Sequence, residues 1–144
     1  MKSAGCLKTL LASLSPVRIE GEFVYCTFPA AHYGDYSELQ PMASIMEDEG
    51  LSLIVRKAIA DENKLTYAGV FACISLGAYS SLEAVGLTAT VAPRLAAHGV
   101  ATNMIAGYHH DHIFVQTELA DLAISVLQEL SASQAMLDSE SPDN

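Results

Sequence analysis

Residues 68–76 read AGVFACISL and residues 80–87 read SSLEAVGL, so an apolar run meets a polar junction where a helix-like segment begins. The first run is uninterrupted by charge, which is typical of a buried strand. The segment TATVAPRLAAHG continues the helix, and Gly99 is suited to end it as a left-handed cap. Its apolar face consists of Leu87, Val91 and Leu95. The junction therefore joins a strand to a helix and gathers hydroxyls, a carboxylate and a glycine.

The residues after this helix predict two more strands and a second helix. Residues 100–108 and 112–116 alternate as strands around a histidine-rich turn, and residues 117–130 form a helix with Thr117 as its N-cap. Its expected apolar stripe is Leu119, Leu122, Val126 and Leu130. The order lacks one strand of a ferredoxin-like βαββαβ unit. Residues 132–144 are polar and acidic, so we expect a disordered tail there.

The front half of the chain has strands in surplus. We expect a helix over 5–14, strands over 17–20 and 22–28, a loop over 29–41, and hairpin strands over 42–46 and 51–55. A strand from this half can complete the unit formed by the second half. We therefore predict an α+β, ferredoxin-like protein of two units, residues 1–66 and 67–131, with a shared or exchanged strand.

Composition indicates a globular chain that avoids nucleic acid and membranes. The 144 residues are 51% hydrophobic and 17% charged, and no apolar run approaches the ~20 residues of a membrane span. Lys and Arg number 7 against 17 acids, and the net charge of −10 repels phosphate backbones. Lys8 interrupts the short apolar N-terminal stretch, so a signal peptide is not indicated and a cytoplasmic location is expected.

The cysteines and the motifs argue against catalysis and cofactors. Cys6, Cys26 and Cys73 are odd in number and lack a CxxC pair, so neither a disulfide framework nor a zinc ribbon is indicated. Cys26 and Cys73 lie in apolar strand candidates, where thiols behave as small hydrophobes. The chain has no phosphate loop, GxSxG or GxGxxG motif. We expect no enzyme activity and no cofactor.

The HHDH run at 109–112 carries the ligand types of zinc or nickel. In an extended chain His110 and His112 face one side, while His109 and Asp111 face the other. One chain therefore does not present all four groups to a single ion. A solvated hairpin turn is the favoured interpretation, and a metal-binding protein is the alternative.

Residues 80–115 resemble the ACT domain, a small-molecule-binding regulatory module. The resemblance rests on the EAVGL loop that opens the helix, the HGV turn at 98–100 and the DHIFV strand at 111–115. It is most specific to tandem ACT pairs of small bacterial proteins related to aspartokinase regulatory domains and to the eukaryotic arginine sensor. The front half resembles a companion ACT unit with a rearranged order, through its FVYCTF strand and its hairpin.

The resemblance implies a regulatory module without catalysis that binds an amino-acid effector. In this family the effector lies where the strand-to-helix loop of one unit faces a strand of its partner unit. The implied ligand-binding residues are Ser80, Ser81, Glu83, Val85, Gly86, Leu87, Asn103, Ile105 and Asp111. A lone module must transmit binding through association, so we expect a homo-oligomer and an unidentified protein partner.

Elementary chemistry favours the same junction. Gly86 lets a ligand approach the backbone, and amides at a helix start receive a carboxylate. Glu83 or Asp111 can then pair with an ammonium group, and an α-amino acid presents both charges.

Two alternatives to a ligand site remain open at the sequence level. Ser80 and Glu83 also fit the S-x-x-E capping box, which needs no ligand. A structural oligomerisation module is a second alternative, since ferredoxin-like sheets pair edge to edge. Pro93 adds an uncertainty of geometry, because it predicts either a kinked helix or a helix that starts near Thr90.

Overall fold

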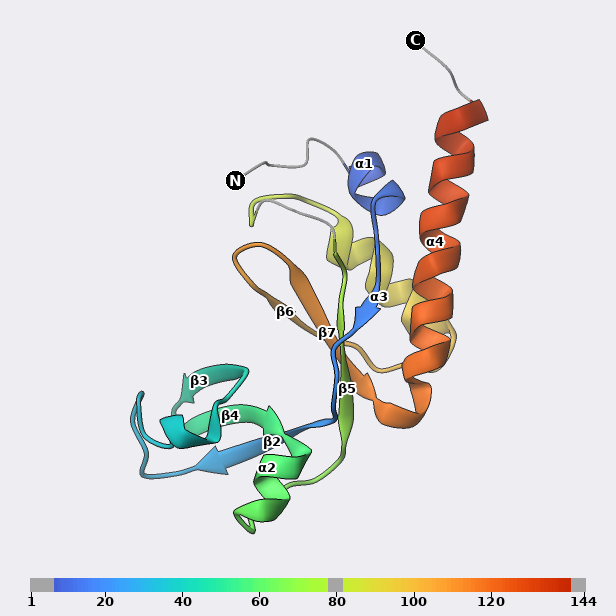
Figure 1. The fold of residues 1–144 in the computed structure, drawn as a ribbon. Helices are drawn as coiled ribbons and strands as arrows, with labels where there is room; N and C mark the ends of the chain where they lie inside the picture. The colour runs from blue at the N-terminus through green and yellow to red at the C-terminus, as the bar shows by residue number, and fades with distance from the viewer. Residues whose placement is uncertain (1–6, 78–81, 141–144) are drawn as a thin grey trace. The chain divides into compact units, whose positions relative to one another are not determined.

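The computed structural model describes residues 7–77 and 82–140, with side chains as far as residue 137. Its elements are α1 (Leu7–Ala12), β1 (Val17–Arg18), β2 (Phe23–Phe28), η1 (Ser37–Leu39), β3 (Ala43–Glu47), β4 (Gly50–Arg56), α2 (Lys57–Glu62), β5 (Phe71–Ser75), α3 (Leu87–Ala97), β6 (Asn103–Ala106), β7 (Asp111–Gln116), η2 (Thr117–Leu119) and α4 (Ala120–Glu140) (Figure 1). Among the described residues, no helix is long and apolar enough to cross a membrane.

The chain divides into two compact units. The central unit is Glu20–Ala72, and the terminal unit combines Met1–Ile19 with Cys73–Asn144. The predicted division into residues 1–66 and 67–131 follows the order of the chain. Packing instead groups α1 and β1 with the elements of the second half.

The terminal unit has the strand order β1-β5-β7-β6. Its elements β5, α3, β6, β7 and α4 follow the predicted order of strand, helix, strand, strand and helix. The fourth strand is β1, which pairs antiparallel with β5 so that Val17 lies opposite Ser75 and Arg18 opposite Ile74. The front half thus donates the strand that the second half lacks. The predicted ferredoxin-like α+β fold with an exchanged strand is confirmed.

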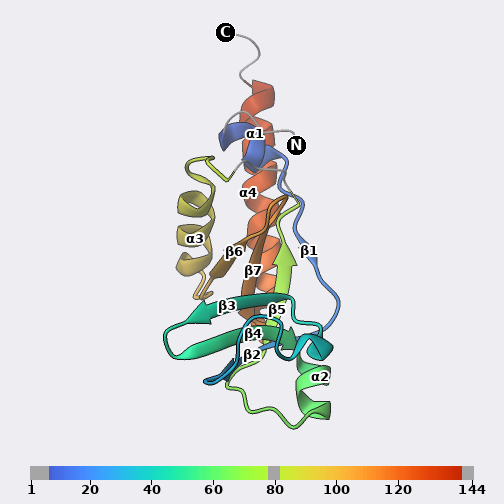
Figure 2. The same cartoon turned by 90° about the vertical axis from the view of Figure 1, so that its left-hand side faces the viewer.

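Helix α3 buries the three residues expected from its spacing, Leu87, Val91 and Leu95. It packs against α4, and α1 lies against both helices (Figure 2). Pro93 lies inside α3, and the helix begins at Leu87 and not near Thr90. Gly99 has φ +77°, and its amide donates to the Ala96 carbonyl at 2.9 Å, as expected for a left-handed cap.

The expected N-cap of the last helix is wrong, and its expected apolar stripe is confirmed at Val126 and Leu130 but not at Leu122. Thr117 opens η2, and among the described residues its buried Oγ1 has no hydrogen-bond partner, so it caps nothing. Leu122 is 39% exposed. The short 3-10 turn rotates the helix, and the buried stripe consists of Ala120, Ala123, Val126, Leu127 and Leu130.

The expectation of a disordered tail is also wrong for residues 132–140, because α4 continues to Glu140. Alanine, leucine and methionine favour a helix in this segment, and neither glycine nor proline occurs before Pro142. The polar composition correctly indicated that this segment is exposed to solvent, but it wrongly indicated a disordered backbone. Residues 141–144 lie outside the described part of the chain.

The central unit has the strand order β3-β4-β2-β5, with Phe71 of β5 opposite Phe23 of β2. Numbered along the chain, the central unit places its strands as second, third, first and fourth, and the terminal unit, read from β6, places its strands as third, fourth, second and first. β3 and β4 form the predicted hairpin, which closes where Glu47 lies opposite Gly50. Residues 29–42 replace the first helix of the unit with a loop that contains only η1.

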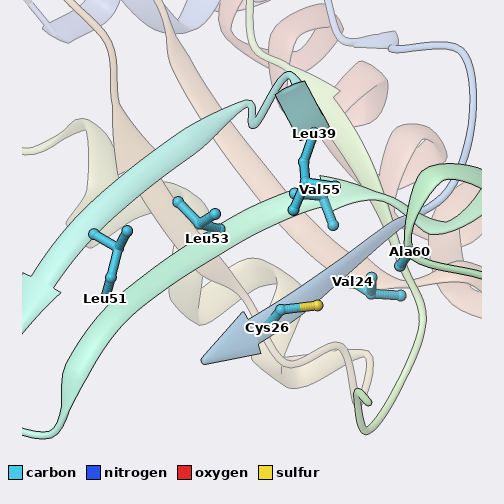
Figure 3. Close-up of a cluster of buried hydrophobic side chains, with 7 residues drawn as sticks. All are labelled: Val24, Cys26, Leu39, Leu51, Leu53, Val55 and Ala60. Atoms are coloured by element: carbon cyan, nitrogen blue, oxygen red, sulfur yellow. The ribbon is translucent and has the colours of Figure 1, made fainter. Parts of the chain in front are cut away.

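A cluster of apolar side chains fills the core of the central unit (Figure 3). Strand alternation points Val24 and Cys26 of β2 to the same face as the odd-numbered residues of β4. The cluster consists of Val24, Cys26, Leu39, Leu51, Leu53, Val55 and Ala60. Leu39 comes from η1, so the loop that replaces the helix is anchored in this core.

Truncation of Leu53 tests this core. Leu53 is 1% exposed, so Leu53→Ala should cost about 2–5 kcal/mol of unfolding free energy. Ile45, on the neighbouring strand of the same hairpin, is 48% exposed, so Ile45→Ala should cost under about 1 kcal/mol. Urea denaturation measures both values. Equal costs would contradict the assignment of Leu53 to the core.

Candidate ligand-binding site

A hollow of about 300 Å³ lies at the start of α3 in the terminal unit. Its wall consists of Leu82, Ala84, Gly86, Leu87, Thr88, Ala89, Ala106 and Asp111. The register of β6 and β7 places Ala106 opposite Asp111, at the end of the hairpin. The loop before α3, its first turn and this hairpin end therefore form one concave surface.

The first turn of α3 presents backbone amides without helical acceptors. Gly86 is the N-cap, and no side chain donates or accepts a capping hydrogen bond there. The first helical bond runs from the Thr90 amide to the Gly86 carbonyl at 3.0 Å. The amides of Leu87, Thr88 and Ala89 therefore have no acceptor within the helix. They form the positive end of the helix dipole.

Three of the residues implied by the family resemblance line this hollow: Gly86, Leu87 and Asp111. Asp111, the first residue of β7, lines the same hollow as the amide end of α3. One wall thus favours negative charge and another favours positive charge.

The other implied residues do not line the hollow as the structure describes it. Val85 is 87% exposed, and Glu83 is also exposed in the loop. Asn103 Nδ2 donates to the Phe114 carbonyl at 3.4 Å, and Ile105 lies opposite His112 in the hairpin. Ser80 and Ser81 lie outside the described residues. Their roles in ligand binding stay predictions.

Sequence reasoning missed Thr88, Ala89 and Ala106, and also Leu82 and Ala84 of the loop before α3. The first two follow from the helix start at Leu87, since the first turn must border anything held at that end. Ala106 follows from the hairpin register, because it is the cross-strand partner of Asp111. The side chain of Thr88 is also engaged, and its Oγ1 donates to Met104 Sδ at 3.1 Å.

Gly86 also has a structural role in the turn before α3. Its φ is +106°, and a Cβ built there would lie 2.9 Å from Leu7 Cδ2. The face of Gly86 on which a Cβ would stand therefore packs against Leu7 of α1, and a ligand cannot approach the backbone from that face. The capping-box alternative is also wrong, because α3 starts at Leu87 and Glu83 precedes it by a full turn. Glycine is needed here for the turn that leads into the helix.

The histidine-rich turn is held by its backbone. The Gly107 amide donates to the His110 carbonyl at 2.8 Å, and the ring of His109 packs edge-on against Tyr108. Within residues 7–77 and 82–140, no three His, Cys, Asp or Glu side chains are grouped as a metal site requires.

The two described cysteines are buried in strands. Burial raises the pKa of the Cys73 thiol to about 12 and also raises the pKa of Cys26. Thiolate is the nucleophilic form, so both groups are inert at neutral pH.

Family comparisons agree with the geometry of both units. Models described as ACT domain match residues 5–72 and residues 70–129. The chain belongs to the ACT-domain family. It carries two ACT domains in tandem, and a regulatory ligand-binding module is the function that this architecture supports. No curated protein matches the sequence.

Solved structures include one relative at high identity. A Vibrio cholerae protein of unknown function, described as a possible transport protein, is 45% identical with a TM-score of 0.79, and the alignment covers 87% of this chain and 95% of that one. A protein from Agrobacterium tumefaciens is 12% identical with a TM-score of 0.67, over 82% and 89% of the two chains.

The regulatory subunit of aspartate kinase from Thermus thermophilus is 10% identical with a TM-score of 0.60, over 82% of this tandem ACT chain and 97% of that one. At this identity the likeness concerns the fold alone.

Substitution of Gly86 tests the turn before α3. Gly86→Ala should destabilise the protein by about 1–3 kcal/mol, from backbone strain and the Leu7 contact. Gly99→Ala is the control, because φ is also positive but nothing lies within 4 Å of its Cβ position. Urea denaturation should show the larger loss of unfolding free energy for Gly86→Ala. Combining Gly86→Ala with Leu7→Ala should reduce the part of that loss that comes from the Leu7 contact. An equal loss at both glycines would contradict the Leu7 contact.

The raised thiol pKa predicts slow alkylation. At about pH 8, Cys73 should resist iodoacetamide in the folded protein and react rapidly in urea, because a pKa of about 12 leaves almost no thiolate. Peptide mass spectrometry follows the site directly. Rapid labelling without urea would contradict the burial of Cys73 in β5.

Proposed function

We propose that this tandem ACT protein senses a free α-amino acid, which it binds in the hollow at the start of α3. One observation carries the proposal. The uncapped first turn of α3 and the acidic residue Asp111 border the same space of about 300 Å³. An α-amino acid carries a carboxylate and an ammonium on one carbon, so it matches both ends of this space.

The carboxylate of the ligand would accept hydrogen bonds from the first-turn amides of α3. Such amides bind anions because their hydrogens are unpaired and the helix dipole adds positive potential. The ammonium would donate to Asp111, and charge-assisted hydrogen bonds are about twice as strong as neutral ones. Both ends of the ligand are thereby satisfied without a further charged residue.

The remaining wall bears on specificity. It is built from alanine and leucine side chains with the Thr88 hydroxyl, and among the described residues neither lysine nor arginine lines it. A second carboxylate on the ligand would therefore find no lining cation and would face Asp111. We expect neutral amino acids to bind more tightly than aspartate or glutamate.

Two further features belong to the same proposal. Binding is transmitted by association, through self-assembly or an unidentified protein partner, and no catalytic step is assigned. The protein acts in the cytoplasm, where free amino acids are metabolic signals. The fold shared with the regulatory subunit of an aspartate kinase supports a regulatory role.

A thermal-shift panel of the standard amino acids tests the proposal. A ligand at 100 times its Kd adds about 2.7 kcal/mol and should raise Tm by several degrees. Asp111→Asn keeps the shape of the wall but removes its charge, so it should abolish most of the shift. Asp121→Asn, an equal charge change on the exposed face of α4, should leave the shift intact.

The outcomes separate the function from its location. If no amino acid raises Tm, amino-acid sensing is wrong and a structural oligomerisation role becomes the better hypothesis. If Tm rises equally in the Asp111→Asn variant, the protein binds amino acids elsewhere.

A further inference from the structure

The central unit contains a second and larger hollow, of about 490 Å³, where β2 ends and the following loop turns back. It is lined by Thr27, Phe28, Pro29, Ala30, Ala31, Asp35, Tyr36 and Glu38. All of these residues belong to the central unit. The loop that forms it takes the place in the chain that α3 has in the terminal unit.

One wall of this hollow is aromatic. The rings of Phe28 and Tyr36 stack with their centroids 4.1 Å apart and an interplanar angle of 27°. Tyr36 is 39% exposed and lines the hollow. An aromatic ring face is electron-rich and attracts cations.

Tyr36 holds a backbone conformation that needs support. Its φ is +63°, and such a positive value is rare for a residue with a bulky side chain. Its carbonyl accepts the amide of Leu39 at 3.0 Å, and Leu39 is 3% exposed in the core cluster of Figure 3. The aromatic wall is thus fixed by the packing of the unit.

Hydrogen bonds also hold the rest of the loop between β2 and β3 in place. Asp35 Oδ2 accepts the His32 amide at 2.8 Å, and His32 Nδ1 lies 3.8 Å from the same oxygen. Tyr33 Oη accepts the amide of Met46, on the edge strand β3, at 2.9 Å. The hollow is therefore formed before any ligand arrives, which lowers the entropic cost of binding.

The charged side chains of the lining have one sign. Asp35 and Glu38 are both acids, and neither lysine nor arginine is found in the lining within the described part of the chain. A carboxylate has about four acceptor positions, so Asp35 keeps capacity beyond the His32 amide. An anionic ligand would be repelled, whereas a cation meets two carboxylates and an aromatic face.

We propose that this hollow binds a small organic cation, an ammonium group carried on an apolar body. The ammonium lies towards Asp35 and Glu38, and the apolar body lies against Phe28 and Tyr36. The site is separate from the amino-acid site at α3, because the two hollows share none of the residues that the structure describes. It gives the central unit a ligand of its own and of different charge.

An NMR titration tests the proposal with 2-phenylethylamine as the probe and 2-phenylethanol as its neutral analogue. The amine should shift the amide signals of residues 27–38 saturably, at concentrations below about 10 mM. The alcohol should bind roughly tenfold or more weakly, because it lacks the charge that the two carboxylates attract. Low ionic strength limits screening of these exposed groups.

Three variants assign the binding energy to the site. Asp35→Asn with Glu38→Gln removes both charges but retains an oxygen acceptor for the His32 amide, and it should weaken amine binding roughly tenfold. Glu118→Gln with Glu129→Gln makes the same charge change at exposed positions of the terminal unit and should have no effect. Tyr36→Leu should cost about two- to fivefold, the worth of an exposed cation–π contact.

Folding and location are checked in the same spectra. A dispersed spectrum shows that the double variant is folded, and Asp111→Asn should leave amine binding unchanged. The proposal is overturned if the amine gives no saturable shift, if its shifts map to the terminal unit, or if the alcohol or the folded double variant binds equally well. Amino-acid sensing at α3 is unaffected by each of these results.

Discussion

Backbone pairing along β5 is the constraint on which both units depend. Phe71, at the start of the strand, lies opposite Phe23 of β2, while Ile74 and Ser75, at its end, lie opposite β1. The boundary between the units falls inside this strand. Each ferredoxin-like unit needs a fourth strand, and an unpaired edge leaves amides and carbonyls without partners. One continuous strand supplies those partners to both units.

The position of β5 also determines where the candidate site lies in the terminal unit. β5 leads through the junction to α3, and the hairpin of β6 and β7 returns beside it with Ala106 opposite Asp111. The Leu76 amide donates to the Asp111 carbonyl at 3.0 Å, so the residue after β5 holds Asp111 beside that strand. The acid and the amides of the α3 start thus come from segments more than twenty residues apart in the chain.

The spacing of apolar residues and the positions of turn-forming residues predicted most helices and strands. Apolar spacing located α3 and its buried face, and the acidic turn located the hairpin of β3 and β4. The start of the last helix was misplaced, because a turn of 3-10 helix leaves no separate signal and rotates the stripe. The tail was misread, because polar composition reports solvation and says little about backbone conformation. Among the site residues, the contact of Gly86 with Leu7 could not be predicted, since the two residues are remote in sequence.

The sequence by itself determined the family, the ferredoxin-like fold with a donated strand, and the junction before α3, because these depend on local spacing and motifs. Only the tertiary structure decided that Thr88, Ala89 and Ala106 border the same hollow as Asp111, and that the loop after β2 forms another. Concave surfaces arise from the packing of segments distant in the chain, and local patterns carry no information on which side chains will face each other. Local patterns in the sequence located individual residues on their helices, strands and loops, whereas the neighbours of each residue in space depended on the packing of the whole chain.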